Sequence, residues 1–449
     1  MKRLFGTDGI RGEANLYPMI PEIALQVGRA VGYLFKNYHH QSKIIIGKDT
    51  RLSGYLFESA LTAGLCSMGV NVYLIGPIPT PGIAFLTKDM RADAGIVISA
   101  SHNPYYDNGI KIFDNNGFKL PDELERKIEN FVFNENFSEE RALKEKVGRV
   151  FRIKDALGRY AVHLKSVVPP YLNFEGLKIG IDCANGACYH IGPLIMEELG
   201  AKVYSLYCEP NGLNINENCG ALYPNEVKKL VLEKNLHLGI ALDGDGDRIA
   251  VIDDKGNFWD GDDLIALFAL YFKEKGLLTS PYIVGTVMTN QGLEKFLEKE
   301  GLKLIRTPVG DRYVVMSMKE NKALLGGETS GHIIFFDKAT TGDGLLCALR
   351  LATILIEKGK NLSEFHPPFE KFPQVLINIQ VKEKKPLEEI PELLNRVEDL
   401  NIKLGKKVRI LIRPSGTEPK YRVMVEALSE DLAKEVAEEL AEIIRRNLL

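Results

Sequence analysis

The feature of this sequence that most limits its fold is one order of segments that recurs over the first two-thirds of the chain. A short apolar, β-branched segment ends in a loop rich in Gly or Asp, and a segment with helical periodicity follows it. In the first cycle, strands are predicted at 42–46, 70–75 and 94–99, and a helix at 52–68. Such alternation of strands and helices is typical of an α/β protein.

Two more cycles of the same kind follow. The predicted strands lie at 177–182, 203–207, 238–242 and 282–285, and the predicted helices at 192–199, 262–272 and 344–357. The cycles share an order of elements but show no self-similarity of residues at fixed spacing, so the repeat is architectural.

The pattern changes after Pro367-Pro368. Strands are predicted at 374–381, 407–412 and 421–427, and the last helix is expected to begin with Ser429 as its cap. This part of the chain therefore reads as a separate, smaller α+β unit.

The chain length agrees with several domains, because 449 residues exceed the roughly 150 of a usual one. We expect three similar α/β domains followed by the smaller α+β domain. The expected spans are 1–150, 151–254, 255–368 and 369–449.

Composition limits the partners. A formal net charge of -3 gives no general field that attracts anions, so any phosphate must be recognised by local groups of Arg and Lys, and nucleic acid is not an expected partner.

The longest apolar stretch, at 264–272, is far shorter than a membrane helix requires, and the N-terminus has no apolar signal region. The six cysteines show no paired metal spacing and are expected to be reduced thiols. The prediction is a cytoplasmic protein.

A serine stands just beyond the predicted strand 94–99. In Ser99-Ala100-Ser101-His102-Asn103-Pro104 the last two residues favour a turn. Ser101 could project its hydroxyl into a cleft and act as a nucleophile, with His102 beside it. Alternatively, both side chains only satisfy backbone groups of the turn. These residues alone leave the two interpretations open.

Three aspartates alternate with glycines in Asp243-Gly244-Asp245-Gly246-Asp247, which Arg248 follows. Carboxylates so close together repel one another unless a cation is present, and dense oxygen ligands favour Mg²⁺. An EF-hand would need glycine where Arg248 stands and helices on both sides, so calcium storage is disfavoured. A solvated acidic turn is the other interpretation, and the spacing favours the metal site.

Two further loops carry polar groups. In the segment 326–332, Glu328 and Ser330 can hydrogen-bond to hydroxyl groups of a ligand, and Arg312 is either another polar contact or a surface ion pair. Near the C-terminus, a Gly-containing turn with hydroxyls and arginines could enclose a phosphate dianion, whereas an ordinary turn would explain only its glycine. Its residues are Arg413, Ser415, Gly416, Thr417 and Arg422.

In this order the four loops resemble those of the α-D-phosphohexomutase superfamily, and the resemblance runs from Leu4 to the final helix. It implies four domains around a central cleft, an active phosphoserine, one Mg²⁺ per active site, a sugar-recognition loop and a C-terminal phosphate-binding loop.

The resemblance also implies roles for single residues. Ser101 matches the phosphoserine and shares Mg²⁺ with Asp243, Asp245 and Asp247, and Lys111 and His332 match candidates for proton transfer. Burial and neighbouring cations could lower the proton affinity of Lys111 and make it an acid or base, and the alternative is that it only neutralises phosphate. The remaining catalytic residues are Arg11, His102 and Arg248, and the substrate contacts are Glu328, Ser330, Arg413, Ser415, Gly416, Thr417 and Arg422.

Segments 5–12, 106–111 and 208–212 resemble the phosphoglucosamine mutase branch more than the phosphomannomutase branch. Thr329 stands where the former usually carries an amide, which leaves the strictness of amino-sugar preference open. The implied reaction interconverts glucosamine 6-phosphate and glucosamine 1-phosphate. A bisphosphorylated sugar would be the intermediate and could also act as an activator. Rotation of the last domain near Pro367 and Pro368 would let this intermediate reorient.

Alternatives stay open at this point. The chain could be a mutase for glucose or mannose phosphates, a phosphatase with a phosphoserine intermediate, or a non-catalytic sensor of sugar phosphates. The expected partner is a small-molecule sugar phosphate, with no nucleic acid and no membrane, and a homodimer is the assembly left open.

Overall fold

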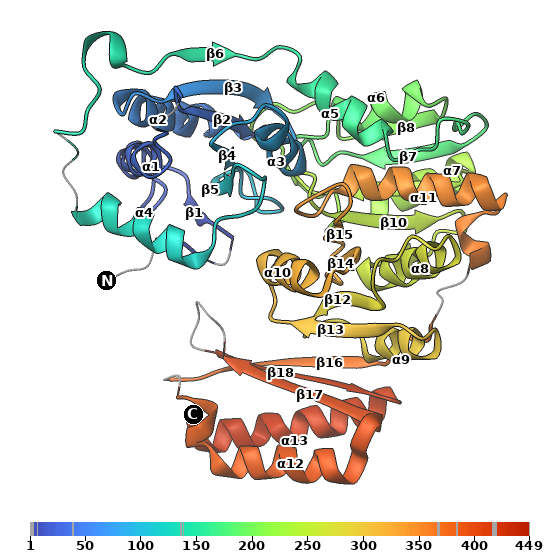
Figure 1. The fold of residues 1–449 in the computed structure, drawn as a ribbon. Helices are drawn as coiled ribbons and strands as arrows, with labels where there is room; N and C mark the ends of the chain where they lie inside the picture. Colours follow the sequence, from blue (N-terminus) through green and yellow to red (C-terminus); the bar gives the residue numbers. More distant parts are fainter. Residues whose placement is uncertain are drawn as a thin grey trace.

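The computed structural model describes residues 4–6, 8–37, 40–134, 137, 139–365, 369–382, 385–414 and 420–448. The expected pivot at Pro367 and Pro368, and three expected phosphate contacts, Ser415, Gly416 and Thr417, lie outside these ranges. The chain forms four sheets in succession, and the last of them belongs to a lobe set apart from the other three (Figure 1).

The first unit is a six-stranded sheet in the order β1-β5-β4-β2-β3-β6. Its strands are β1 (Ile10–Glu13), β2 (Lys43–Lys48), β3 (Asn71–Pro77), β4 (Ala94–Ile98), β5 (Asp107–Asp114) and β6 (Val150–Arg152), and its helices are α1 (Pro21–Leu34), α2 (Gly54–Ser67), α3 (Thr80–Asp89) and α4 (Asp122–Asn134). β5 runs antiparallel to β4 and places Lys111 opposite Val97. The expected domain boundary near 150 falls at the start of β6, which pairs with β3.

The second unit has the strand order β11-β10-β9-β7-β8, and the third β13-β12-β14-β15. The second contains α5 (Ala156–Lys165), β7 (Lys178–Asp182), α6 (Ile191–Glu198), β8 (Lys202–Leu206), α7 (Asn225–Lys234), β9 (Leu238–Leu242), β10 (Ile249–Asp253) and β11 (Phe258–Trp259). The third contains α8 (Gly261–Glu274), β12 (Tyr282–Thr286), α9 (Gln291–Lys299), β13 (Lys303–Thr307), α10 (Asp311–Asn321), β14 (Leu325–Gly327), β15 (Ile333–Phe335) and α11 (Gly344–Lys358).

The C-terminal unit is an antiparallel sheet in the order β16-β18-β17. Its elements are β16 (Gln374–Gln380), α12 (Pro391–Leu404), β17 (Val408–Pro414), β18 (Lys420–Ala427) and α13 (Glu430–Leu448). Ser429 caps α13 as expected, because its hydroxyl accepts a hydrogen bond from the Leu432 N–H at 3.3 Å. Both helices cover one face of the sheet, and the other face is turned toward the third unit (Figure 1). Three α/β units followed by a smaller α+β unit is the predicted fold class.

The hydrophobic cores do not follow the four sheets one to one. One continuous cluster of buried side chains runs through the first three units, with Ile45, Ile240, Ile283 and Leu345 among its members. The C-terminal unit has a core of its own between its sheet and its two helices. Burial of apolar surface therefore joins the first three units to one another more firmly than it joins them to the fourth.

A buried ion pair also links the first unit to the third. The guanidinium of Arg312 on α10 contacts the carboxylates of Asp122 and Glu125 on α4, and only 8% of the Arg312 side chain is exposed. The interpretation of Arg312 as a surface ion pair is therefore wrong, because the pair is buried between two units, and its interpretation as a ligand contact stays a prediction. Within the described ranges, no helix is both long and apolar enough to cross a membrane.

Candidate active site

Ser101 lies directly beyond β4, where the backbone turns through a left-handed conformation with φ 52°. Its hydroxyl donates to Oδ2 of Asp243 at 2.6 Å, and its backbone N–H donates to the Ser99 hydroxyl at 2.9 Å. The side chain is almost fully buried. Two loops that are 142 residues apart in the chain thus meet at one hydrogen bond.

Arg51 supports this serine loop and was not found from the sequence. Its guanidinium is fully buried and donates to the backbone carbonyls of Ser101 at 2.9 Å and Asn103 at 2.8 Å. The Asp49 carboxylate accepts from its Nε at 2.8 Å. Asp49-Thr50-Arg51 follows β2 as the serine loop follows β4, so its place beyond a parallel strand was the available signal.

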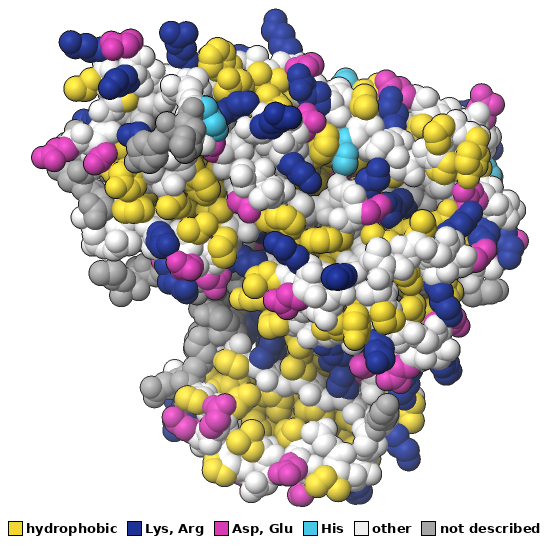
Figure 2. All heavy atoms as spheres, in the orientation of Figure 1, with side chains coloured by type: hydrophobic (Ala, Val, Ile, Leu, Met, Phe, Trp, Pro, Cys, Tyr) yellow, Lys and Arg dark blue, Asp and Glu magenta, His cyan; other side chains and the backbone are white. Residues whose placement is uncertain are grey.

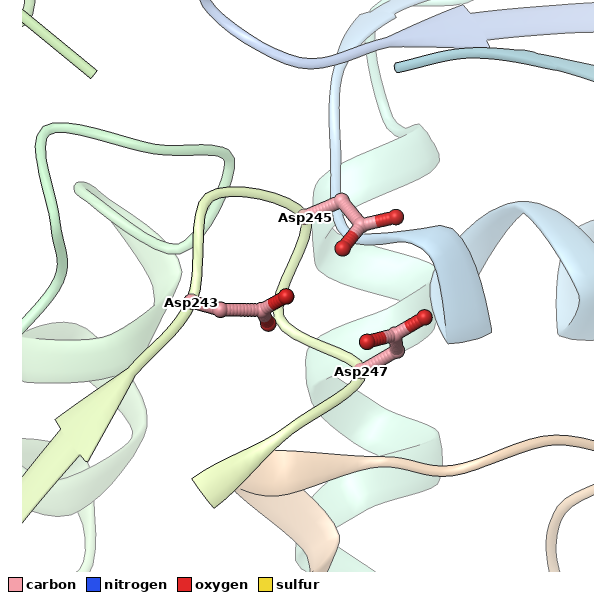
Figure 3. A group of neighbouring side chains, drawn as sticks. All are labelled: Asp243, Asp245 and Asp247. Atoms are coloured by element: carbon pink, nitrogen blue, oxygen red, sulfur yellow. The ribbon is translucent and has the colours of Figure 1, made fainter. Parts of the chain in front are cut away.

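The three aspartates of the loop between β9 and β10 converge (Figure 3). One carboxylate oxygen from each of Asp243, Asp245 and Asp247 lies within 4.8 Å of the others, and all three side chains are buried. Oδ1 of Asp245 and Oδ1 of Asp247 accept no hydrogen bond from the described residues. A hard divalent cation needs such a set of oxygen donors, so these residues fit a metal ion.

The charges of the triad are only partly balanced by the protein. Burial, together with Asp247 and Asp245, raises the pKa of Asp243 well above its ordinary value. Burial has the same effect on Asp247, but Lys111 and His332 outweigh it and hold its pKa well below the ordinary value. The other two carboxylates repel a negative charge on Asp243, and a bound cation would offset this repulsion.

Lys111 is buried on β5 among carboxylates. Its Nζ lies 2.9 Å from Asp245, 3.3 Å from Asp8 and 3.6 Å from Asp247. These carboxylates raise the pKa of Lys111 against the opposing effect of burial. The expected lowering of its proton affinity is therefore wrong in this structure, because the nearest charges are negative.

Asp8 is a second residue that the sequence did not indicate. Its carboxylate contacts Arg11, Lys111 and Lys119, and these three cations hold its pKa well below the ordinary value although burial opposes them. Lys119 also pairs with Asp311 of the third unit at 2.8 Å. An alternating network of acids and bases therefore surrounds the serine and the triad.

The two histidines differ in their surroundings. His102 Nδ1 lies 3.3 Å from the Ser101 hydroxyl oxygen, and burial, Arg248 and Arg11 lower the pKa of His102 to about 4, so its ring is neutral. Against burial, Asp247 and Asp311 raise the pKa of His332 to about 10. The donation from the Gly342 N–H to Nε2 of His332 at 2.9 Å opposes this rise, and Nδ1 faces Asp247 at 3.7 Å.

The loop between β14 and β15 reaches the start of β10. Gly331 has a φ of +87°, and its carbonyl accepts from the Ile249 N–H at 3.1 Å, immediately after Arg248. A Cβ at Gly331 would lie 1.9 Å from the Ile249 oxygen, so only glycine allows this approach. In the same loop Glu328 accepts from the Gly310 N–H at 3.0 Å, whereas Ser330 is exposed.

Arg413 and Arg422 stand directly opposite each other on β17 and β18. Within the part of the chain that the structure describes, neither has an ion-pair partner, and the Nε of Arg422 is buried without a hydrogen bond. Burial and the neighbouring Arg422 lower the pKa of Arg413. Two adjacent, uncompensated guanidinium groups favour a bound anion.

The surface narrows between the C-terminal unit and the other three, and Lys and Arg side chains lie along this indentation (Figure 2). A separate cavity of about 470 Å³ lies elsewhere, between α3, α5 and the segment 336–343. None of the predicted site residues lines it, so the candidate site is defined by the chemistry of its residues and not by this cavity.

Four family models match the chain in succession. They describe the phosphoglucomutase/phosphomannomutase α/β/α domain I at residues 2–139, domain II at 159–256, domain III at 260–372 and the C-terminal domain at 376–443.

Curated relatives match the full chain. The phosphoglucosamine mutase of Nitratidesulfovibrio vulgaris (strain Miyazaki F) is 51% identical over 447 residues, which are 100% of this chain and 99% of the relative. That of Myxococcus xanthus is 52% identical over 99% of this chain and 98% of its own length.

Among solved structures, a phosphoglucomutase/phosphomannomutase family protein from Burkholderia thailandensis superposes with a TM-score of 0.83 at 22% identity, covering 99% of this chain and 98% of its own. N-acetylphosphoglucosamine mutase of Aspergillus fumigatus, solved in complex with GlcNAc-6P and magnesium, gives a TM-score of 0.65 at 20% identity over 99% and 95% of the two chains. These two likenesses concern the fold. Together with the curated relatives and the four family models, they lead to one conclusion. The chain belongs to the phosphoglucosamine mutases, intramolecular phosphotransferases of the α-D-phosphohexomutase superfamily.

Proposed function

We propose that this chain interconverts glucosamine 6-phosphate and glucosamine 1-phosphate through a phosphate carried on Ser101 and a bisphosphorylated sugar intermediate. The observation that carries the proposal is the 2.6 Å contact between the Ser101 hydroxyl and Asp243 within the acidic triad, in a chain 51% identical to curated phosphoglucosamine mutases. Asp243, Asp245 and Asp247, with Ser101, would hold one Mg²⁺. When bound, Mg²⁺ supplies positive charge to the phosphate oxygens.

In the first half-reaction a sugar hydroxyl oxygen attacks the phosphorus on Ser101. A bond from that oxygen to phosphorus forms, the bond from phosphorus to the serine oxygen breaks, and the hydroxyl proton ends on the serine oxygen. The chain's part is mainly positioning and charge neutralisation. Lys111, Arg11 and Arg248 are proposed to neutralise the reacting phosphate, because each contacts the triad or the serine loop.

In the reverse transfer, when the freed Ser101 hydroxyl attacks the intermediate, its proton needs an acceptor beside Ser101. Neutral His102, with Nδ1 3.3 Å from the serine oxygen, is best supported by distance and charge. Lys111 and His332 stay candidates by resemblance. Lys111 is surrounded by carboxylates that favour its charged form, and Nδ1 of His332 faces Asp247, so both serve better to fix charge and geometry.

In the second half-reaction the other end of the sugar faces Ser101, so the intermediate must reorient. Arg413 and Arg422 are proposed to hold the phosphate that is not reacting, together with Ser415, Gly416 and Thr417. Glu328 and Ser330 are proposed to bind the sugar hydroxyls in both poses.

The test is parallel turnover of the 6-phosphates of glucosamine, glucose and mannose. We expect glucosamine 6-phosphate to give the highest kcat/KM and no net release of phosphate. A preference for glucose or mannose phosphate would favour the second candidate, a phosphoglucomutase or phosphomannomutase. The reason to consider it is Thr329, which stands in the sugar loop where phosphoglucosamine mutases usually carry an amide. Steady release of inorganic phosphate would indicate a phosphatase.

Intact-mass measurement tests the intermediate. We expect a phosphate on Ser101 of the purified protein and its transfer to added substrate. A protein that turns over substrate while Ser101 never carries phosphate would contradict the mechanism.

A further inference from the structure

Thr329, in the sugar loop between β14 and β15, directs its hydroxyl toward the start of α8. The hydroxyl donates to Asp262, at 3.1 Å from Oδ1 and 3.2 Å from Oδ2. The loop is also fixed through its backbone, because the Gly261 N–H donates to the Thr329 carbonyl at 3.0 Å. Asp262 is fully buried at the start of α8.

Asp262 holds a second group. Its Oδ2 accepts from the backbone N–H of Asn290 at 2.8 Å. Asn290 caps α9 and exchanges two hydrogen bonds with Phe372, at 3.0 Å from Nδ2 to the Phe372 carbonyl and 3.0 Å from the Phe372 N–H to Oδ1. Phe372 lies in the segment that enters β16, so Asn290 anchors the connection to the C-terminal unit.

The C-terminal unit rests on the same turn, residues 286–291, which we call the seat. The Gln291 N–H donates to the buried carboxylate of Glu426 on β18 at 3.1 Å. Arg409 on β17 pairs with Glu426 at 2.9 Å and donates to two carbonyls of the seat, at 2.6 Å to Val287 and 3.1 Å to Thr289. One residue of the connecting segment is fixed separately, since Lys371 pairs with Asp260 and Asp263 at 2.8 and 2.6 Å.

We propose that Asp262 is a positioning residue that couples the sugar loop to the seat of the C-terminal unit. Displacement of Thr329 by a bound sugar would move or release Asp262, and through Asn290 the change would reach Phe372. That the loop binds a sugar rests on the proposed function, whereas the coupling itself rests on these contacts.

Burial disfavours the charged form of the Asp262 carboxylate. Burial and Asp260 raise the pKa of Asp262 to about 7, while the bonds from Asn290 and Thr329 and the charge of Lys371 oppose the rise. An apolar residue would leave the Asn290 N–H buried without a partner, which would destabilise the turn. The Asp262 carboxylate accepts from both groups at once.

Amide hydrogen exchange of the full chain without substrate tests the coupling. Thr329→Val removes only the hydroxyl, and the lost hydrogen bond, about 1 kcal/mol, should speed exchange about fivefold at Asn290 and Phe372 as well as in the sugar loop. Thr329→Ser keeps the hydroxyl and should restore the slow rate. Thr353→Val is the matched control, because the buried Thr353 hydroxyl donates only within α11, to the Leu349 carbonyl at 2.8 Å. Unchanged exchange at Phe372 in Thr329→Val would overturn the proposal.

Kinetics give a second readout. Thr329→Val and Asn290→Ala should each raise KM more than they lower kcat, and the double variant should fall short of the product of the two effects by about fivefold. Strict multiplication would count against coupling. If the wild-type chain does not turn over glucosamine phosphates, the proposed function fails while the exchange experiment still decides the coupling.

Discussion

The centre at Ser101 and the arginine pair of the C-terminal unit are built in opposite ways. Around Ser101, acids and bases from the first three units contact one another at close range, and those units share a continuous apolar core. Arg413 and Arg422 carry two positive charges without described ion-pair partners, on a unit with a separate core. That unit meets the third through a few polar contacts at residues 286–291.

The difference follows from the chemistry that each region serves. Phosphoryl transfer needs reacting groups held within narrow distances, which a shared core and buried ion pairs provide. Holding the other phosphate needs only positive charge and hydrogen-bond donors. A unit attached by polar contacts can move with an intermediate that reorients in the site. We therefore expect the first region to control kcat and the second to control KM.

The largest effect is expected from Ser101→Ala, which removes the oxygen that carries the phosphate. Turnover should fall by at least about 10⁴-fold, since a missing nucleophile cannot be replaced by its neighbours. Binding of the sugar phosphate should stay close to that of the unphosphorylated wild type, because the arginine pair is untouched. Calorimetric titration with glucosamine 6-phosphate measures the binding separately from the turnover. Ser59→Ala on the exposed face of α2 is the control, and loss of binding in Ser101→Ala would break the comparison.

Arg422→Ala should act on KM. Charge-assisted hydrogen bonds to a phosphate are worth about 1.5–3 kcal/mol, so KM should rise roughly 10- to 100-fold with a much smaller change in kcat. Steady-state kinetics measure both constants. Arg445→Ala, in an exposed pair with Glu442 on α13, should leave KM unchanged. A fall in kcat that matches the rise in KM would show that the arginine pair takes part in the transfer itself.

Sequence patterns found the parts of the molecule whose signal is local. The strands β2, β4, β7 and β9 are apolar runs that end in turn residues, and the acidic triad lies within five consecutive positions. Because parallel strands place their carboxyl ends at one edge, loops found separately could be expected to meet. The chain's membership in the superfamily and the overall fold class were both reached from such short segments.

The residues that were missed act through distant contacts. Asp8, Arg51 and Asp311 are single charged residues with no local signature, and each also contacts residues that lie many positions away in the chain. The sign of the Lys111 pKa shift was wrong for the same reason, since its carboxylate neighbours come from two other loops. Local periodicity indicates where a side chain points, whereas its electrostatic environment is set by the tertiary structure.

Asp243→Asn should make the metal-free protein more stable. The pKa of Asp243 is raised in the fold, so its charge at neutral pH disfavours folding. In Asp243→Asn the side-chain oxygen still accepts from the Arg248 N–H, and the amide N–H can donate to the Ser101 hydroxyl oxygen in place of the present bond. We expect the melting temperature without metal to rise by about 2 °C. Added Mg²⁺ should raise the melting temperature of the wild type but not the melting temperature of Asp243→Asn. Differential scanning calorimetry measures both, and a metal-free variant less stable than the wild type would contradict the account.

The smallest effect concerns the pH dependence of stability in the shared core. Asp343 is buried at the start of α11, where it accepts from the Leu346 N–H at 2.9 Å and from the Tyr160 hydroxyl of the second unit at 2.7 Å. Burial raises its pKa from 3.8 to about 6. The folded protein therefore keeps a proton that the unfolded chain releases between these values, so Asp343 stabilises the fold below pH 4 and loses this contribution as the pH rises to about 6.

Asp343→Asn should remove this slope, which corresponds to about one proton, while its side-chain oxygen still caps α11. Calorimetry from pH 4.5 to 7.5 measures the change, with Asp431→Asn on α13 as the control in the C-terminal unit. If the first three units unfold together and the fourth separately, only the transition of the shared core should differ between Asp343→Asn and the wild type. Parallel stability curves for the two proteins would mean that Asp343 keeps its charge in the fold, and the same shift in both transitions would mean that the cores are not independent.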